Sequence, residues 1–381
     1  MSSAPSHAIT WAEVDLDAYR ANLRAIRQWV GPQVQVFAVV KANAYGHGLV
    51  PLAQAALQAG ATRLVVHRLE EGLALRAAGI TAPILLLGYV PLAAAAQVAR
   101  HDLIPTVITL EFVRALAAHA SPARPHPVHI NVDTGMGRYG LLPPEVVDFL
   151  RAVGEIPGVQ VEGLYTHFAT ADEADTTYLR HQWRVFQDVL AAVDAAGLMP
   201  PIRHACNSAA TFALPEAHLD AVRPGIATYG LRPSLAWDAP VPLRPVLTWK
   251  SRVARVRTLP PGSGIGYGRT YITQRPTTVA LVPVGYGDGY VRRLSNRAQV
   301  LVRGRRAPVV GRVSMDQIVV DVSAIPGVAL EDEVVLLGRQ GGEHIPAEEI
   351  AAWAETINYE VTTLLLPRVT RVYRDASRPQ G

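Results

Sequence analysis

Cysteine is nearly absent from this 381-residue sequence, which contains only Cys206. A single cysteine cannot form a disulfide within the chain, so nothing indicates an oxidising compartment. The first residues, Met1–His7, have neither the basic start nor the apolar run of a secretory signal peptide. We therefore expect a cytoplasmic protein.

Long runs of one charge and long apolar runs are also missing. Charged residues make up 18% of the chain, the net charge is only +4, and the densest basic cluster, residues 303–306, is very short. Nucleic-acid binding therefore has no support. Residues 81–99 carry no charge, but two prolines, a glycine and a glutamine interrupt them. This pattern favours a strand, a turn and a helix, so we expect no membrane partner.

Lysine is scarce. Of the 36 basic residues only Lys41 and Lys250 are lysines, and the others are arginines. A guanidinium is not a usable amine nucleophile and does not readily lose its proton, whereas a lysine amine can do both. A lysine that persists in such a sequence is a candidate for chemistry, and this argument applies to either of the two.

Metal and nucleotide signatures are lacking as well. No group of His, Cys or Asp residues has the spacing of zinc ligands, so we expect no metal. The glycines of residues 264–268 lack the strand-to-helix context of a dinucleotide-binding motif.

Apolar residues, in contrast, make up 49% of the chain, enough for a large core. We expect a helix at residues 15–29 and then eight short apolar strands, at residues 34–40, 63–67, 84–87, 106–110, 128–133, 161–167, 202–208 and 221–227. Helices are expected between them, at residues 49–59, 70–78, 111–118, 144–153 and 177–195. Eight such units in about 200 residues predict an α/β fold with a closed parallel (β/α)8 TIM barrel rather than an open sheet.

The pattern changes after the proline-rich residues 233–245, which suggest a linker. We assign residues 1–240 to the barrel and residues 241–381 to a mostly antiparallel β domain. Its expected strands lie at residues 247–259, 278–284, 298–302, 307–313, 318–322 and 333–337, with a helix at 347–353. Residues 8–14 alternate like a strand and are a candidate for pairing with this second domain.

The active site of such a barrel lies at the C-terminal ends of its strands. The chemistry-bearing residues there are Lys41, Tyr45, Arg138, His167, Asn207, Ser208, Arg223, Gly225 and Ile226. Alone, each has a structural explanation: a core histidine, a paired arginine, a helix N-cap. Together, an amine and a candidate phosphate cradle indicate a Schiff base to a phosphorylated aldehyde, which means pyridoxal 5′-phosphate (PLP).

The segment Ala38–Gly48, AVVKANAYGHG, resembles the PLP-attachment signature of the alanine racemase family. Similar segments extend over nearly the whole chain, at residues 11–17, 132–138, 162–172, 223–230, 266–268, 285–290, 311–317 and 357–361. The family combines an N-terminal barrel with a C-terminal β domain and forms a homodimer with shared active sites. The resemblance implies racemisation of L-alanine to D-alanine, which supplies bacterial peptidoglycan.

The resemblance also implies individual roles. Lys41 would hold PLP and act as one base, and Tyr267 from the partner subunit would be the second base on the opposite face. The residues that would bind the cofactor are Lys41, Tyr45, Arg138, His167, Asn207, Ser208, Arg223, Gly225, Ile226 and Tyr359. Substrate binding would fall to Arg138, Met315 and Asp316, and the entrance would be lined by Tyr286 and Arg292.

Two positions depart from the family pattern. Asn131 stands where many members carry a carbamylated lysine, and either a bound anion or a direct hydrogen bond from Arg138 to the amide oxygen of Asn131 would compensate. His67 is unfamiliar at the end of its strand, and a structural hydrogen bond is the expected role.

Three alternative functions remain open. The first is a racemase for another small amino acid such as serine, because one methylene changes discrimination only modestly. The second is a PLP-dependent decarboxylase, which Arg223 opposes, because decarboxylases generally place a carboxylate at the pyridine nitrogen. The third is a non-catalytic PLP-binding barrel, which the presence of the β domain opposes.

Overall fold

The computed structural model describes residues 7–234, 236–237 and 239–376. Most of the N-terminal stretch examined for a signal peptide, and two positions of the proline-rich segment, lie outside these residues. The chain divides into two compact units. We call residues 19–44 and 49–244 the barrel unit, and residues 1–18, 45–48 and 245–381 the β unit.

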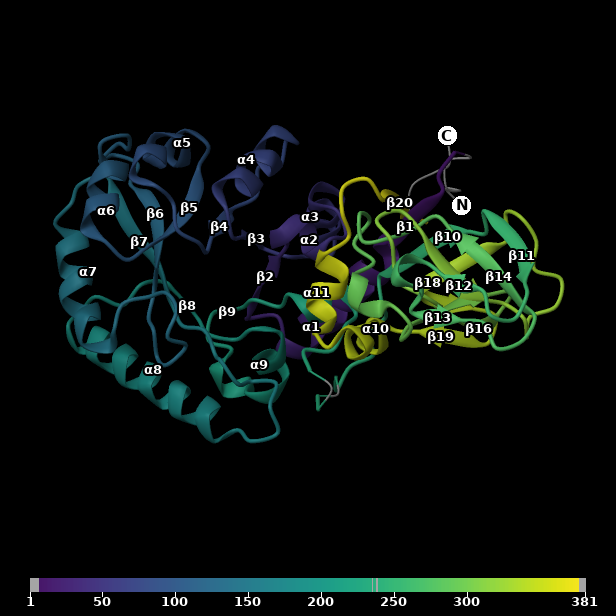
Figure 1. Cartoon of the computed structure of the whole chain (residues 1–381). Helices are drawn as coiled ribbons and strands as arrows, with labels where there is room; N and C mark the ends of the chain where they lie inside the picture. The colour runs from purple at the N-terminus through teal and green to yellow at the C-terminus, as the bar shows by residue number, and fades with distance from the viewer. Residues whose placement is uncertain (1–6, 235, 238, 377–381) are drawn as a thin grey trace. The chain divides into compact units, whose positions relative to one another are not determined.

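A closed barrel of eight parallel strands forms the centre of the barrel unit (Figure 1). The strands are β2 (Gln35–Val39), β3 (Arg63–Val66), β4 (Ile84–Leu86), β5 (Leu103–Val107), β6 (His126–Asn131), β7 (Val159–Tyr165), β8 (Ile202–His204) and β9 (Ala221–Val222). The barrel closes where β2 pairs with β9, through Gln35 with Ala221 and Val36 with Val222. The predicted barrel is therefore confirmed.

Helices surround the barrel because each buries one apolar face against the strands. In α6 (Leu110–Ala117) the buried residues are Phe112, Val113 and Leu116, which recur at helical spacing. The other helices of this unit are α1 (Leu16–Val30, which begins in the β unit), α3 (Leu49–Gln58), α4 (Leu69–Ala77), α5 (Ala95–Arg100), α7 (Val146–Gly154), α8 (Thr177–Ala195) and α9 (Ser208–Ala213).

Some element boundaries differ from the prediction for local reasons. Strand β5 ends at Val107 because Thr109 caps α6, its hydroxyl accepting a hydrogen bond from Phe112 N. The strand expected at residues 221–227 stops at Val222, and a 3-10 turn at Ile226–Tyr229 follows. Proline at position 224 cannot donate to a strand ladder, which explains the early end.

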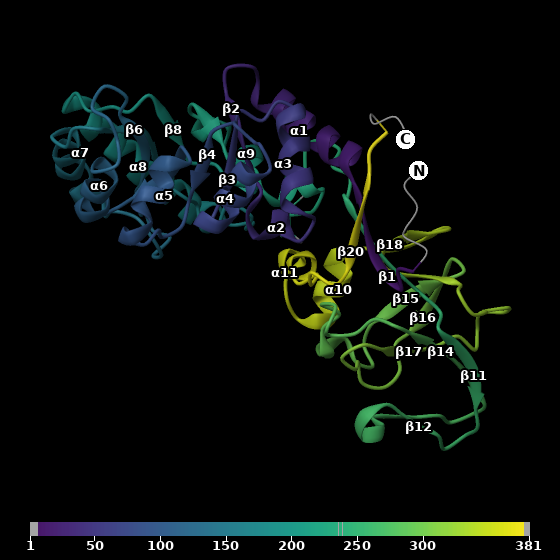
Figure 2. The same ribbon diagram turned by 90° about the horizontal axis from the view of Figure 1, so that it is seen from above.

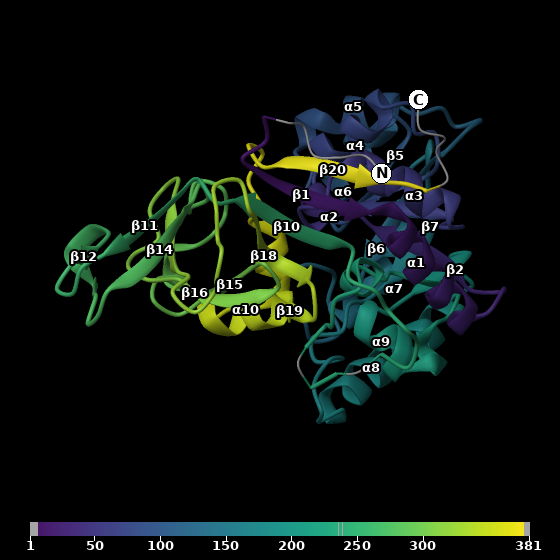
Figure 3. The same ribbon diagram turned by 90° about the vertical axis from the view of Figure 1, so that its right-hand side faces the viewer.

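The β unit contains a sheet in the order β16, β15, β18, β10, β1, β20, with β19 paired to β18. In Figure 3 the N-terminal strand β1 lies between β10 and β20. The strands of this sheet are β1 (Thr10–Asp15), β10 (Leu247–Arg252), β15 (Gln299–Val302), β16 (Arg305–Pro308), β18 (Glu333–Gln340), β19 (Glu343–Ile345) and β20 (Thr370–Arg374). Only the pairing of β1 with β20 is parallel.

A smaller sheet in the order β11, β14, β17 completes the β unit, together with a hairpin of β12 and β13. These strands are β11 (Arg255–Leu259), β14 (Thr277–Val282), β17 (Ile318–Asp321), β12 (Gly264–Ile265) and β13 (Tyr271–Ile272). Figure 2 shows the hairpin projecting beyond β11 at one end of the unit. Residues 247–259, predicted as one strand, form two because β10 and β11 join different sheets. Helices α10 (Ala347–Ala354) and α11 (Asn358–Thr363) lie later in the chain.

Within the described residues, no helix has both the length and the apolar character needed to span a bilayer.

Candidate active site

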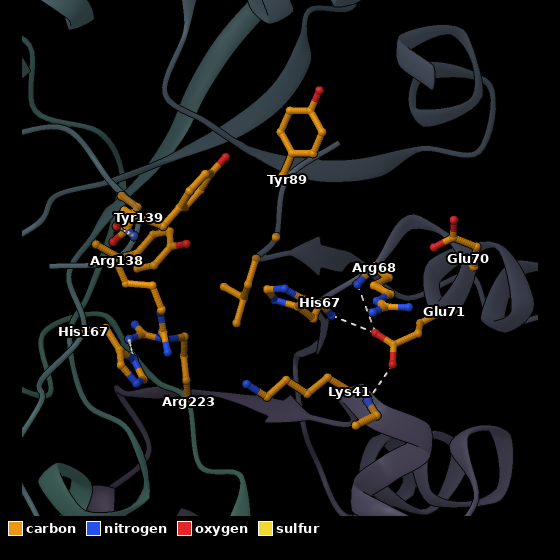
Figure 4. Close-up of a pocket in the computed structure, with 15 residues that line it drawn as sticks. Lys41, His67, Arg68, Glu70, Glu71, Tyr89, Arg138, Tyr139, His167 and Arg223 are labelled. Atoms are coloured by element: carbon orange, nitrogen blue, oxygen red, sulfur yellow. Dashed lines mark hydrogen bonds between the residues drawn. The ribbon is translucent and has the colours of Figure 1, made fainter. Parts of the chain in front are cut away.

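A cavity of about 900 Å³ opens in the barrel unit, where the strands end (Figure 4). Lys41, His167 and Arg223 face it from the ends of different strands. The residues that line it are Lys41, Ala42, His67, Arg68, Glu70, Glu71, Leu87, Gly88, Tyr89, Asn131, Arg138, Tyr139, Tyr165, His167 and Arg223. Four predicted site residues, Lys41, Arg138, His167 and Arg223, are thus brought together with Asn131 and His67.

Lys41 stands where β2 gives way to an unusual turn. Ala42, Asn43 and Ala44 have φ angles of 53°, 54° and 52°, and Tyr45 continues with 53°. Left-handed backbone costs L-residues about 1–2 kcal/mol each, so other contacts must hold this turn. One is Glu71, whose carboxylate accepts a hydrogen bond from Ala42 N at 2.5 Å.

Glu71 is a site residue that the sequence analysis did not single out. One carboxylate oxygen binds the turn after Lys41, and the other accepts from His67 N at 2.9 Å and Arg68 N at 3.0 Å. It thereby ties the end of β3 and the start of α4 to the lysine turn. An acidic residue in the first turn of a helix is common, so Glu71 does not stand out in the sequence. Nothing there indicates its hydrogen bond with Ala42 N.

The Lys41 amine extends into the cavity on the side of Arg223 and His167 (Figure 4). Burial lowers the pKa of Lys41, and the positive charge of Arg138 lowers it further. Glu71 acts in the opposite direction. The surroundings therefore favour the free amine, which is the nucleophilic and basic form.

Lys250, the other lysine, has a structural role. Its amine lies 3.2 Å from a Glu13 carboxylate oxygen and 2.9 Å from a Glu333 carboxylate oxygen, joining three strands of the β unit. The surroundings of the two lysines, between which scarcity alone does not choose, therefore favour Lys41 as the candidate.

Arg223 is buried, with 3% of its surface exposed. Its guanidinium donates to Thr166 O at 2.7 Å and Ala205 O at 3.0 Å, and it lies 2.5 Å from His204 Nδ1. Burial lowers the pKa of Arg223 to about 10, so the side chain stays charged at neutral pH. His167 lies 3.3 Å from the same guanidinium, and burial together with Arg223 lowers its pKa well below the ordinary value.

The loop that carries Arg138 is organised by Asp133. This carboxylate accepts hydrogen bonds from the backbone N–H groups of Gly135, Gly137 and Arg138 at 2.9, 3.0 and 3.1 Å. The neighbouring Asn131 donates from Nδ2 to Tyr139 O at 2.6 Å. Its Oδ1 is buried and accepts no hydrogen bond from the described residues. Arg138 therefore does not donate to Asn131, and the expected direct bond between them is not formed.

His67 makes its hydrogen bond through the backbone. Its ring lines the cavity and packs over Gly88, where an added Cβ would lie 2.8 Å from the ring. The bond from His67 N to Glu71 is a backbone one that any residue here could make, so the structural hydrogen bond expected of the His67 side chain stays a prediction.

The predicted phosphate-binding residues of the barrel unit also meet. Asn207 caps α9, accepting from Ala210 N at 3.0 Å. The Ser208 hydroxyl oxygen accepts from Gly225 N at 2.8 Å and from Ala227 N at 3.3 Å. Ser208, Gly225 and Ile226 therefore form one compact group of polar backbone and hydroxyl atoms.

The remaining predicted residues belong to the β unit. Tyr267, Met315 and Tyr286 are exposed by 72%, 54% and 40%. The Asp316 carboxylate forms an ion pair with Arg368, with 2.8 Å between Oδ1 and Nη2. The other three are Arg292, in a 3-10 turn at Arg292–Leu294, and Tyr45 and Tyr359, whose ring centroids are 6.2 Å apart.

Comparison with known proteins gives consistent matches. The family model of the alanine racemase N-terminal domain matches residues 14–233, and that of the alanine racemase C-terminal domain matches residues 246–373. An alanine racemase of Symbiobacterium thermophilum is 52% identical over 96% of this chain and 97% of its own.

Solved structures agree with these matches. The structure of an alanine racemase from Bacillus anthracis with bound L-Ala-P is 43% identical and has a TM-score of 0.93, covering 98% of this chain and 97% of its own. One from Bartonella henselae, with covalently bound pyridoxal phosphate, is 32% identical and has a TM-score of 0.86, covering 96% of this chain and all of its own.

Proposed function

Because the chain belongs to the alanine racemase family, we propose that it interconverts L-alanine and D-alanine using PLP held on Lys41. The observation that carries this proposal is the Lys41 amine, whose pKa is lowered in a cavity shared with Arg138, His167 and Arg223.

The residues present fit the cofactor. Arg138 and Arg223 place two cationic groups around the cavity that Lys41 faces, which suits an anionic ligand with a phosphate and a phenolic oxygen. The hydroxyl of Ser208 and the backbone N–H of Ile226 would donate to the phosphate, and Gly225, whose N–H is donated to Ser208 Oγ, would hold that hydroxyl in place. The B. henselae relative carries pyridoxal phosphate covalently bound, which supports the same attachment here.

When bound, PLP supplies an electron sink that acidifies the α-hydrogen of the amino acid. Racemisation then needs a proton to leave one face of the α-carbon and another to arrive at the opposite face. We assign removal on one face to the Lys41 amine and the opposite face to the phenol of Tyr267 of the partner subunit. The 72% exposure of Tyr267 supports this assignment, because an exposed phenol is available to a second copy of the chain.

The other residues orient the reactants. Arg138 would bind the substrate carboxylate, since a guanidinium matches its geometry. Met315 and Asp316 would complete the substrate end, and Tyr286 and Arg292 would line the entrance. His167 would lie beside the cofactor ring, and Asn207, Tyr45 and Tyr359 would complete its binding site.

This proposal includes a homodimer with shared active sites, a cytoplasmic location and a supply of D-alanine for peptidoglycan. A two-base site divided between subunits explains why exposed Tyr267, Met315 and Tyr286 lie in the β unit.

The proposal is tested by incubating the purified holoenzyme with single L-amino acids and separating the products by chiral chromatography. D-alanine should form fastest. Turnover of serine or another amino acid without D-alanine would refute the alanine assignment.

Borohydride treatment tests the attachment site. The reduced cofactor should be recovered on the Lys41 peptide and lost in Lys41→Ala. Lys250→Arg is the matched control and should still be labelled, because Lys250 serves an ion pair. Labelling that disappears in Lys250→Arg would overturn the proposal.

A further inference from the structure

A chain of hydrogen-bonded side chains runs through the interior of the barrel from Arg223. Arg223 lies 2.5 Å from His204 Nδ1, and His204 Nε2 lies 2.9 Å from His129 Nδ1. His129 Nε2 in turn lies 3.0 Å from a carboxylate oxygen of Glu162. Glu162, His129 and His204 lie on the strands β7, β6 and β8, and Arg223 directly follows β9, so side chains from four neighbouring parts of the barrel are linked in a line.

The chain is shielded from water along its middle. His129 and His204 have no exposed surface. The ring of Tyr165 stacks on His204, with centroids 4.7 Å apart and planes 9° from parallel. Gly163 leaves room for His129, because an added Cβ would lie 2.3 Å from the ring. The rings therefore have little freedom to turn.

The two ends of the chain have opposite hydrogen-bonding character. A guanidinium can only donate, so Arg223 must present an N–H to His204 Nδ1. At the other end, Arg63 binds Glu162 with two hydrogen bonds, at 2.7 and 3.1 Å. Burial raises the pKa of Glu162, but hydrogen bonds from His129 and Arg63 outweigh it and lower the pKa to about 2. Glu162 is therefore ionised and can only accept.

These ends fix the protons between them. His204 Nδ1 must be bare to accept from Arg223, so the proton of neutral His204 lies on Nε2. His129 Nδ1 must then be bare to accept from it, and the proton of His129 lies on Nε2, pointing at Glu162. Arg63 Nη1 lies 3.5 Å from His129 Nε2. Both atoms lie closer to the Glu162 carboxylate, at 2.7 and 3.0 Å, so each donates to Glu162.

We infer that Glu162, His129 and His204 are positioning residues that hold Arg223 in one orientation, with both histidines neutral and protonated on Nε2. A proton added to either ring would place two donors face to face. The very low pKa values of both histidines, caused first by burial, agree with this arrangement. Arg223 lines the cavity, so its fixed orientation determines how it meets a cofactor there.

The first test observes the protons directly, in a neutron structure of the holoenzyme. Deuterium should be found on Nε2 of His129 and His204, and both Nδ1 atoms should be bare. Deuterium on His204 Nδ1, or on both nitrogens of either ring, would overturn the inference. This result does not depend on the reaction, whereas the activity measurements below rest on the proposed function.

The second test changes the acceptor end. The amide NH2 group in Glu162→Gln must face either His129 or Arg63. Both of these residues donate to Glu162, so two donors would then meet. We expect kcat to fall about tenfold or more with KM little changed, because a buried donor loses its acceptor.

Asp220→Asn is the matched control. Asp220 binds Arg203 at 2.7 and 3.2 Å in the same barrel, and the side chain of Arg203 is partly exposed. It should change kcat less than about twofold. Equal effects of the two variants would refute the inference.

The third test preserves the polarity of the chain. Glutamine at position 204 can accept from Arg223 with its oxygen and donate to His129 with its nitrogen, as neutral His204 does. His204→Gln should therefore keep the absorbance spectrum and the dissociation constant of the bound cofactor, whereas His204→Leu should weaken cofactor binding about tenfold. Equal behaviour of these two variants would count against the inference.

The measurements distinguish the two proposals. If no alanine is racemised but the protons lie as stated and His204→Gln outperforms His204→Leu in cofactor binding, the proposed function fails and the positioning chain stands. If Glu162→Gln does not fold, the neutron structure of the native protein and the pair of variants at position 204 still decide.

Discussion

Arg223 combines full burial with a charge that it keeps, and both properties bear on the chemistry of the site. Its guanidinium can only donate hydrogen bonds, so a pyridine nitrogen facing it would stay unprotonated. An unprotonated nitrogen is a weaker electron sink, which should favour return of the proton over side reactions.

Replacing Arg223 by glutamate tests this explanation. A carboxylate would favour a protonated pyridine nitrogen, so Arg223→Glu should lower racemisation about tenfold or more and raise transamination. The measurement is release of the 2-oxo acid from L-alanine. Arg223→Gln is the matched control, since it removes the guanidinium without adding a carboxylate. No rise in transamination for the glutamate variant over the glutamine variant would contradict the explanation.

The buried histidines make the fold sensitive to acid. Burial lowers the pKa of His129 to about 4 and those of His167 and His204 well below the ordinary value. Their folded forms stay neutral while the unfolded chain takes up protons below about pH 6.5, so their stability contribution is present above that pH and lost as the pH falls.

We expect the free energy of unfolding to drop by about 2 kcal/mol per buried histidine between pH 7 and pH 5. Urea unfolding at one protein concentration measures this drop. In His204→Gln the drop in unfolding free energy should be smaller by about the contribution of one histidine. Glu162 adds a further loss of stability below about pH 4.5, because its pKa in the folded protein is about 2. An unfolding free energy equal at the two pH values would contradict the assignment of neutral buried histidines.

At the scale of single residues, the sequence pointed to Lys41, Arg138, His167 and Arg223, which the structure places around one cavity. Strand ends are recognisable in a sequence, and these side chains follow them. The interior partners Glu162, His129 and His204 were not singled out. A histidine within an apolar strand resembles any core residue, and its contacts become known only when the barrel closes.

The barrel strands were predictable in number and kind but less so in length. Each of the eight overlaps an expected strand, because short apolar runs alternate with helical patterns, whereas the short strands β12, β13, β19 and β20 of the β unit were not expected. Strand β5 was placed a few residues late, since the cap at Thr109 was not recognised. The left-handed turn after Lys41 had no signal in the sequence, because alanine rarely adopts positive φ and residues 42–45 contain no glycine.

Strand β7 contains a glycine whose size is required by a neighbouring strand. A Cβ on Gly163 would lie 2.3 Å from the His129 ring. Gly163→Ala should therefore lower the free energy of unfolding by about 1–3 kcal/mol through overpacking. Gly154→Ala, at the end of α7 with no atom within 4 Å of the added Cβ, is the control and should be neutral or stabilising. Equal unfolding curves for the two variants would show that His129 is free to move.

For the whole molecule, the proposed shared site makes a prediction about mixtures. Lys41→Ala and Tyr267→Ala should each be inactive alone. Mixed under conditions that allow subunit exchange, random pairing makes half the dimers mixed, and each mixed dimer has one intact site. The mixture should therefore recover about a quarter of the wild-type activity, as expected for a symmetric dimer.

Activity of the mixture and of the separate variants is measured after the same incubation. Two wild-type preparations mixed in the same way provide the control for losses during exchange. A mixture as inactive as its components, with exchange verified by mass spectrometry, would refute a site divided between subunits.

The position of β1 between β10 and β20 has a consequence for biosynthesis. The first strand emerges from the ribosome at residues 10–15, but its two partners begin only at residues 247 and 370. At a translation rate of about 5–20 residues per second, roughly 20 to 70 seconds pass between synthesis of β1 and synthesis of its second partner. The barrel segments are synthesised during that interval, so the sheet that contains the N-terminus is completed only as translation ends.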